Sequence, residues 1–236
     1  MQTPRRRFWV GFWLLTLCLF IFPINNQPLR IATILLGLAA YSCIVYFFRK
    51  QKLVFAGLVF IPISIGLFMI CPGKTAEPQK LRAAYLDSLR TYTGTRYIWG
   101  GENKLGIDCS GLIRAGFIKA NFEQGLQTLN PQMVRFAVSL WWHDCSAKVL
   151  GEEYRGLTQT IISSPDINSL DVTQILPGDM AVTISGVHVL AFLGGDEWIE
   201  ADPTFGKVVI VRVPSTDNPW FNEPVRIMRW TELEAK

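Results

Sequence analysis

One cysteine and one histidine stand where they could act together as a nucleophile and its base. Cys109 lies where a loop containing Gly100, Gly101 and Gly106 meets the start of an apolar helix. A helix start offers a thiolate the positive end of the helix dipole, and its free backbone N–H groups can stabilise an oxyanion. His188 begins a predicted strand, which is a rigid position for a base. The pair therefore predicts nucleophilic catalysis by a cysteine thiolate.

A catalytic histidine also needs a partner for its second ring nitrogen, which fixes the tautomer and stabilises the imidazolium. Glu200 and Asp202 both lie on the next predicted strand, and they share a face because side chains alternate. A three-residue loop between the strands would put Asp202 directly opposite His188 and Glu200 diagonal to it. A five-residue loop would put Glu200 opposite instead. The pattern alone leaves both carboxylates open.

The elements that must position these residues are helices first and strands afterwards. The sequence predicts an amphipathic helix over residues 79–92, a helix from residue 109 to about 120, and a helix that begins at Pro131. Five short β-rich runs follow, over residues 180–185, 188–193, 198–202, 208–213 and 225–230. This order predicts an α+β fold with an antiparallel β-sheet. Residues 121–175 are mixed in composition, and the sequence does not indicate their role.

The first 72 residues differ from the rest because they contain no Asp or Glu. Three uncharged apolar runs, at residues 8–24, 31–48 and 53–71, would each span about 26–29 Å as helices, close to a bilayer core. We expect three transmembrane α-helices that form a membrane anchor over residues 1–72. A linker over residues 73–80 and a polar domain over residues 81–236 would follow.

Basic residues indicate how this arm would be oriented. Six of the seven lie at the amino terminus or at residues 49–52, and only Arg30 lies in the first break. The positive-inside rule places the former two regions in the cytoplasm. Three crossings then put the polar domain on the outer side of the membrane. A signal peptide is the alternative for the first run, but no small-residue cleavage site follows it.

Composition argues against several other classes of protein. The chain beyond residue 72 carries 16 basic and 19 acidic residues, a net charge of −3, so we expect no nucleic-acid partner. Cys18, Cys43 and Cys71 lie in or beside apolar runs, which leaves only Cys109 and Cys145 in the polar domain. With two histidines in the chain and no short cysteine spacing, we expect neither a metal site nor a cofactor.

Three motif blocks resemble, in the same order, the NlpC family of cell-wall cysteine peptidases. The first covers residues 94–101 and 106–112 and includes Asp-Cys-Ser-Gly; the second is Leu-Pro-Gly-Asp at residues 176–179; the third is the histidine strand at residues 188–194. The resemblance implies a papain-like fold and hydrolysis of amide bonds in the stem peptides of bacterial peptidoglycan through a thioester. The domain would then lie on the periplasmic side of the bacterial inner membrane, with the lipid bilayer as a second partner; protein partners are unknown.

The same resemblance assigns roles to individual residues. It implies that Cys109 is the nucleophile and His188 the general base. Tyr97 would lie near the oxyanion or the substrate carbonyl, while Asp108 and Ser110 would meet the free amine of the stem peptide.

The third catalytic position departs from the family's pattern. The family usually has a neutral polar residue, often histidine, 12 residues after the catalytic histidine, and here that residue is Glu200. A carboxylate can also accept the imidazole N–H. We therefore expect Glu200 to be the third catalytic residue, with Asp202 as the alternative.

Two further hypotheses remain open from the sequence. One is a membrane-surface acyltransferase or thioesterase with the same Cys-His chemistry, and the other is a non-catalytic wall-binding module. Trp99 and Trp198 flank the predicted site, so we expect them to contact substrate. His143 lies beside Asp144 and Cys145, but we expect it to lie outside the active site.

Overall fold

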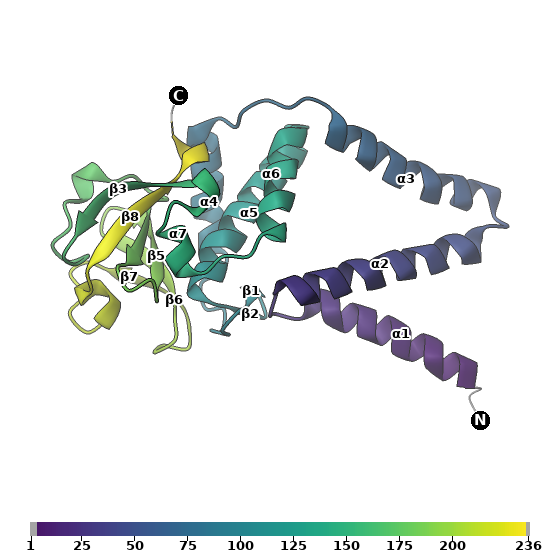
Figure 1. The fold of residues 1–236 in the computed structure, drawn as a ribbon, viewed down its shortest axis with the longest axis horizontal. Helices are drawn as coiled ribbons and strands as arrows, with labels where there is room; N and C mark the ends of the chain where they lie inside the picture. Colours follow the sequence, from purple (N-terminus) through teal and green to yellow (C-terminus); the bar gives the residue numbers. More distant parts are fainter. Residues whose placement is uncertain (1–3, 235–236) are drawn as a thin grey trace.

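The structure, a computed structural model, describes residues 4–234. These residues form three layers, which lie side by side in Figure 1. Three long helices lie on one side, a group of shorter helices lies in the middle, and a β-sheet lies on the other side. The long helices are α1 (Pro4–Ile21), α2 (Gln27–Phe48) and α3 (Lys52–Ile70). Helix α1 lies beside α2, whereas α3 diverges from α2 after the turn that joins them (Figure 1).

Helices α2 and α3 are each long and apolar enough to cross a membrane, and most of their large apolar side chains are exposed. The described apolar part of α1, Trp9–Ile21, is shorter. Two of the three predicted transmembrane helices therefore meet the length and composition expected of a span.

The predicted boundaries of the first two long helices are partly wrong. Helix α1 ends at Ile21 rather than at residue 24, because Pro23 has no N–H for the helix and Ile24 forms a β-bridge with Gly101. Helix α2 begins at Gln27 rather than at residue 31. Its start is fixed by Asn26, whose side chain accepts a hydrogen bond from the N–H of Leu29.

The rest of the chain forms an α+β domain with an antiparallel sheet, as predicted. Six strands lie in the order β3-β8-β4-β5-β6-β7, and each neighbouring pair is antiparallel. The strands are β3 (Thr158–Ser164), β4 (Met180–Thr183), β5 (Val189–Gly194), β6 (Glu197–Asp202), β7 (Lys207–Arg212) and β8 (Val225–Trp230). A separate two-stranded ribbon consists of β1 (Glu102–Asn103) and β2 (Gly106–Ile107).

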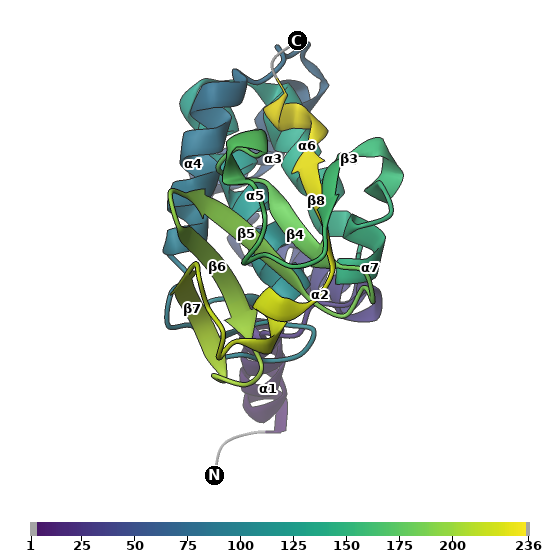
Figure 2. The ribbon, with the colours of Figure 1, turned by 90° about the vertical axis from the view of Figure 1, so that its left-hand side faces the viewer.

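The middle layer covers one face of the sheet with helices α4 (Pro78–Arg90), α5 (Cys109–Gln127), α6 (Pro131–Trp142) and α7 (Ala147–Leu150). Figure 2 looks onto the sheet and shows α5 behind it. Phe117 of α5 stacks on Trp230 of β8 with ring centroids 4.5 Å apart. Leu81, Tyr85 and Leu89 of α4 are fully buried at one helical face, as the amphipathic pattern predicted.

The other face of the sheet has its own core, which includes Ile167, Leu190, Trp198 and Phe221. Short helical turns join the remaining segments: η1 (Tyr154–Gly156), η2 (Val172–Gln174), η3 (Pro219–Asn222) and η4 (Thr231–Leu233). Turn η3 brings Phe221 into this second core, and it becomes important at the candidate site.

Two elements differ from the sequence-based expectation. Strand β3 was not predicted, because its sequence is polar; it is an edge strand that pairs only with β8, so part of it faces solvent. Helix α5 continues to Gln127 rather than ending near residue 120. Polar Asn121 is accommodated there because its side-chain amide donates a hydrogen bond to the carbonyl of Phe117.

Candidate active site

Cys109 is the first residue of α5, and its position is fixed by the side chain of Asp108 just before it. The Asp108 carboxylate accepts hydrogen bonds from the N–H of Gly111 at 2.6 Å and of Gly100 at 2.7 Å, so it caps the helix. A side chain at position 111 would collide with the carbonyl oxygen of Gly101. The turn therefore requires the first and last residues of the Asp-Cys-Ser-Gly sequence, Asp108 and Gly111.

The backbone around the thiol leaves donors free. Among the described residues, none accepts a hydrogen bond from the N–H groups of Cys109 and Ser110. These are the unsatisfied donors that every helix start presents. They lie beside the sulfur, where the oxyanion of a tetrahedral intermediate would form.

His188 is 1% exposed, and its ring is held on two sides. Its Nε2 lies 2.6 Å from Oε2 of Glu200, which is fully buried. The other carboxylate oxygen of Glu200 accepts a hydrogen bond of 2.5 Å from Nδ2 of Asn218. The indole of Trp220 stacks on the imidazole, with ring centroids 4.3 Å apart and planes 18° from parallel. The imidazole therefore has one fixed orientation.

The surroundings of His188 favour its protonated form. Burial by itself lowers the pKa of the imidazolium, but the hydrogen bonds and charges of Cys109 and Glu200 outweigh burial and raise the pKa to about 9. Because Nε2 is bonded to Glu200, Nδ1 is the nitrogen left for the thiol of Cys109. The site thus brings together Cys109, His188 and Glu200.

Asp202 does not contact His188, although the strand register places the two residues opposite each other. Ala191 pairs with Ile199, and this register, continued along both strands, places Asp202 opposite His188. The Oδ1 atom of Asp202 instead accepts a hydrogen bond of 2.5 Å from the N–H of Thr204, in the turn that leads to β7. In the structure Asp202 therefore caps a turn, and the diagonal residue Glu200 contacts the histidine.

The three residues expected to contact substrate lie around the thiol. The Tyr97 side chain is partly buried, and its pKa is raised first by burial and then by the nearby Cys109, Asp108 and Asp202. Ser110 donates a hydrogen bond to Asp108 at 3.1 Å. The pKa of Asp108 is raised by burial, which the hydrogen bonds from Gly111, Gly100 and Ser110 oppose. Asp108 thus caps helix α5, in addition to its expected contact with the free amine of the substrate.

The two tryptophans differ from each other. Trp99 is 82% exposed and can be reached by a large substrate. The expected substrate contact of Trp198 is wrong, because this residue is fully buried in the second core and packs on Phe192 with ring centroids 5.1 Å apart. Adjacency to the site in sequence did not reveal on which face of β6 the side chain lies.

The remaining histidine and cysteine of the domain lie apart from this constellation. His143 follows the last residue of α6, and its Nδ1 lies 2.8 Å from the carbonyl oxygen of Ser139. Burial raises the pKa of the Cys145 thiol to about 12. Within residues 4–234, no group of three or more His, Cys, Asp and Glu side chains could hold a metal ion.

Two residues of the site were missed by the sequence analysis, namely Asn218 and Trp220. Asn218 before Pro219 is a typical helix start, and its side chain does cap η3 by accepting from the N–H of Trp220 at 3.1 Å. This local signal could have been found. The contact with Glu200 joins residues that are distant in sequence, and it depends on the way η3 folds back over the sheet.

A model of the NlpC/P60 family matches residues 94–229 of the chain, which include Cys109, His188 and Glu200. No curated protein matches the chain.

Solved structures of the same type are similar at low sequence identity. NlpC1 from Trichomonas vaginalis is 19% identical, with a TM-score of 0.43, over 67% of this chain and 46% of that protein. The peptidoglycan hydrolase RipB from Mycobacterium tuberculosis is 17% identical, with a TM-score of 0.44, over 89% of this chain and 92% of RipB. The NlpC/p60 domain of the peptidoglycan hydrolase SagA is 22% identical, with a TM-score of 0.37, over 62% of this chain and 97% of that domain. The chain spans less than half the length of NlpC1 and of NlpC2 from T. vaginalis.

Proposed function

The chain belongs to the NlpC/P60 family, as the three motif blocks predicted, and from this membership we propose that it is a membrane-anchored cysteine peptidase of peptidoglycan. The bonds cleaved are amide bonds in the stem peptides, and the intermediate is a thioester on Cys109. The observation that carries the proposal is the buried histidine between Cys109 and Glu200, with a pKa raised to about 9.

The first half of the reaction is acylation. The Cys109 thiolate attacks the carbonyl carbon of the scissile amide, and the electron pair of the C=O bond moves to the oxygen. The N–H groups of Cys109 and Ser110 stabilise this oxyanion. When the intermediate collapses, the C–N bond breaks and protonated His188 gives its proton to the leaving amine. The acyl group remains on the sulfur.

The second half is hydrolysis of the thioester. Neutral His188 now accepts a proton from water, the hydroxide oxygen attacks the thioester carbonyl, and the sulfur leaves as a thiolate. Throughout both halves Glu200 accepts the Nε2 hydrogen bond, so Nδ1 stays directed at the sulfur. Glu200 stabilises the imidazolium and holds its orientation, and it does not itself take up a proton. Asp202, bonded to Thr204, is the less well supported third residue.

Tyr97, Asp108 and Ser110 would contact substrate in this reaction. Tyr97 lies close enough to Cys109 and Asp108 for their charges to raise its pKa, which supports a place beside the substrate carbonyl. Asp108 keeps one carboxylate oxygen that accepts only the Gly100 N–H, so it can still meet an ammonium group of the stem peptide.

The long helices form the anchor in this proposal. Helices α2 and α3 meet the requirements for a span, and α1, which lies beside α2, is 18 residues or about 27 Å long. Three crossings with the basic residues of the amino terminus and of residues 49–52 inside would put the α+β domain on the periplasmic side of a bacterial inner membrane.

The decisive experiment uses the full chain, purified in detergent, with isolated peptidoglycan sacculi as substrate. Mass spectrometry of the released fragments identifies the bond cleaved. Cys109→Ala should abolish the release, whereas the matched Cys145→Ala variant should retain it, because the thiol of Cys145 is buried and its pKa is about 12. Full release by Cys109→Ala would refute the proposed nucleophile.

A further inference from the structure

The turn between α1 and α2 lies against the loop that leads to Cys109. Ile24 forms an antiparallel bridge with Gly101, and the N–H of Asn25 donates to the carbonyl of Gly100 at 3.1 Å. The N–H of Glu102 in turn donates to the carbonyl of Pro23 at 3.0 Å. Residues 23–25 thus pair with residues 100–102 through one antiparallel bridge beside the β1–β2 ribbon.

Side chains reinforce this backbone pairing through a buried arginine. Arg30, in the first turn of α2, is fully buried. Its guanidinium donates to Oε2 of Glu102 at 3.0 Å, to the carbonyl of Asn25 at 2.8 Å and to the carbonyl of Trp142 at 3.2 Å. The Asn25 side chain accepts from Nε of Arg30 at 3.1 Å and donates to Glu102 at 2.7 Å. Nearly all of the donors of this guanidinium are therefore satisfied.

Glu102 connects this arginine to the helix that carries the nucleophile. Its other carboxylate oxygen is paired with Arg114 of α5, which is also almost fully buried. One carboxylate thus lies between a guanidinium of the long-helix arm and a guanidinium of the helix that begins at Cys109. Half-exposed Asp144 lies within 4 Å of both guanidinium groups.

The backbone next to Glu102 holds the residue before the nucleophile. The N–H of Gly100 donates to the Asp108 carboxylate at 2.7 Å, and the N–H of Asp108 donates to the carbonyl of Gly101 at 3.1 Å. A shift of residues 100–102 would therefore move Asp108, and with it the start of α5. The contacts form an unbroken path from Arg30 to Cys109.

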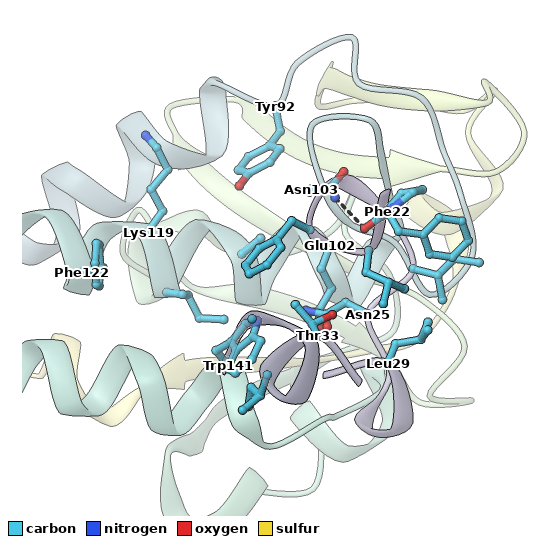
Figure 3. Close-up of a pocket in the computed structure, with 18 of the residues that line it drawn as sticks. Phe22, Asn25, Leu29, Thr33, Tyr92, Glu102, Asn103, Lys119, Phe122 and Trp141 are labelled. Atoms are coloured by element: carbon cyan, nitrogen blue, oxygen red, sulfur yellow. Dashed lines mark hydrogen bonds between the residues drawn. The ribbon is translucent and has the colours of Figure 1, made fainter. Parts of the chain in front are cut away.

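Next to this path the arm and α5 are not closely packed. A cavity of about 710 Å³ separates α1 and α2 from α5, and Figure 3 shows it with Glu102, Asn103 and Asn25 at one end and Phe122 and Lys119 at the other. Neither Cys109 nor His188 lines it. Because apolar packing is interrupted here, the polar contacts of Arg30, Asn25 and Glu102 hold this part of the arm to the domain.

We propose that Arg30 is a positioning residue of the active site, which acts through Glu102 and the backbone of Gly100 and Gly101 on the turn that presents Cys109. This inference rests on the proposed function of Cys109 as the nucleophile. The arm is then part of the catalytic unit as well as an attachment to the membrane. Without Arg30, the Glu102 carboxylate keeps only Arg114 and the small Asn25 amide, and the bridge between residues 24 and 101 loses the side-chain contacts that reinforce it.

The test compares two arginines that both join the long helices to the domain. Arg135 of α6 donates to the carbonyls of Met69 and Cys71 at the end of α3, and these hydrogen bonds do not involve the loop before Cys109. In the full-length protein, Arg30→Met should lower kcat by about 100-fold with little change in KM, because a small displacement of a nucleophile has an effect of this size. Arg135→Met should keep the wild-type kcat.

A second readout does not need the substrate. Alkylation of Cys109 by iodoacetamide, followed over pH by mass spectrometry of the Cys109 peptide, should be slower in Arg30→Met and unchanged in Arg135→Met. Arg30→Lys, which keeps the charge near Glu102, should recover part of both losses. If wild-type protein releases no fragments from sacculi, the proposed function fails, while the alkylation comparison still tests the role of Arg30.

The milder variant Asn25→Ala covers the case in which Arg30→Met does not fold. It removes one hydrogen bond to Arg30 and one to Glu102 without leaving a charge alone. It should lower both kcat and the alkylation rate in protein whose circular dichroism spectrum matches that of the wild type. Wild-type kcat and alkylation rate in folded Arg30→Met or Asn25→Ala, or equal losses in Arg135→Met, would overturn the inference.

Discussion

Nδ2 of Asn218 lies 2.5 Å from Oε1 of Glu200, so an amide from turn η3 holds the carboxylate from the side opposite to the histidine. The other oxygen of Glu200 is 2.6 Å from Nε2 of His188. A carboxylate held by two donors cannot rotate away from the imidazole. The hydrogen-bonded series of the site therefore extends beyond Cys109, His188 and Glu200 to a fourth residue, Asn218.

The pH dependence of the reaction should depend on Glu200. The pKa of His188 is raised to about 9 by Cys109 and Glu200, against the lowering effect of burial. The imidazolium that protonates the leaving amine therefore persists to about pH 9, and kcat/KM should decline above it. Glu200→Gln removes a charge that favours the imidazolium, so the pKa falls and the alkaline decline should move to lower pH. Values of kcat/KM measured from about pH 6 to about pH 10 check this prediction, because a shift of roughly one pH unit in the alkaline decline can be resolved.

The matched control for this variant is Glu197→Gln on the same strand. Glu197 is paired with Arg90 and Arg212 at the surface and does not contact His188. Its removal should leave the pH profile unchanged. An alkaline decline at the same pH in wild type and Glu200→Gln would contradict the assigned role of Glu200.

Asn218 should affect the rate through Glu200. Asn218→Ala removes a hydrogen bond to a charged group, so we expect kcat to fall by about tenfold, which corresponds to ~1.4 kcal/mol. The same change removes the cap of η3. Asn218→Ser retains a capping oxygen but is too short to reach Glu200, so it should restore the melting temperature and not kcat. Recovery of both would mean that Asn218 acts only as a cap.

Asp202→Asn separates the two candidate third residues. The asparagine oxygen can still accept the hydrogen bonds of Thr204 and Phe205, so the turn should persist. Since Asp202 does not bond to His188, the alkaline decline should stay at the wild-type pH. A shift as large as that of Glu200→Gln would show that Asp202 also supports the imidazolium.

The Leu-Pro-Gly-Asp motif should matter for stability more than for chemistry. Asp179 is fully buried and forms two hydrogen bonds of 2.7 Å with Arg229 of β8. Asp179→Asn leaves the partly buried guanidinium of Arg229 with only the half-exposed carboxylate of Glu234 at 3.8 Å, and we expect a loss of about 3 kcal/mol in the free energy of unfolding. Glu152→Gln, which breaks an exposed pair with Lys148, is the control and should change the melting temperature very little. Equal melting temperatures for both variants would refute the prediction.

The orientation of the long helices in the membrane can be tested by maleimide labelling of variants that each contain a single cysteine. With three crossings, Cys71 should react with a membrane-impermeant maleimide in spheroplasts, since it is exposed at the outer end of α3. Lys50→Cys, and a cysteine added before Met1, should react only after permeabilisation. A reactive added cysteine in intact spheroplasts, with Lys50→Cys still protected, would mean that α1 does not cross.

Sequence reasoning was most successful where a local pattern determines the structure. The amphipathic spacing of Leu81, Tyr85 and Leu89 predicted α4, and the β-rich run at residues 225–230 coincides with β8. The choice between Glu200 and Asp202 could not be made from the register, because the contact depends on side-chain direction at the end of the strands. His188 bonds to the diagonal residue even though the register places Asp202 opposite.

Long-range contacts explain what was missed. Asn218 and Trp220 reach His188 and Glu200 only because η3 folds over the sheet. Arg30 was counted as one basic residue among seven, a charge relevant to membrane orientation. In the structure it is fully buried against Glu102, and no local pattern predicts a partner so far along the chain.

The pairing of residues 23–25 with residues 100–102 has a consequence for biosynthesis. A ribosome completes residues 23–25 long before it reaches the loop that they pair with. Under the proposed three-crossing topology, the turn between α1 and α2 would therefore reach the outer side of the membrane before the nucleophile segment is translocated. In that topology the loop before Cys109 would meet residues 23–25, already in place, as it emerges.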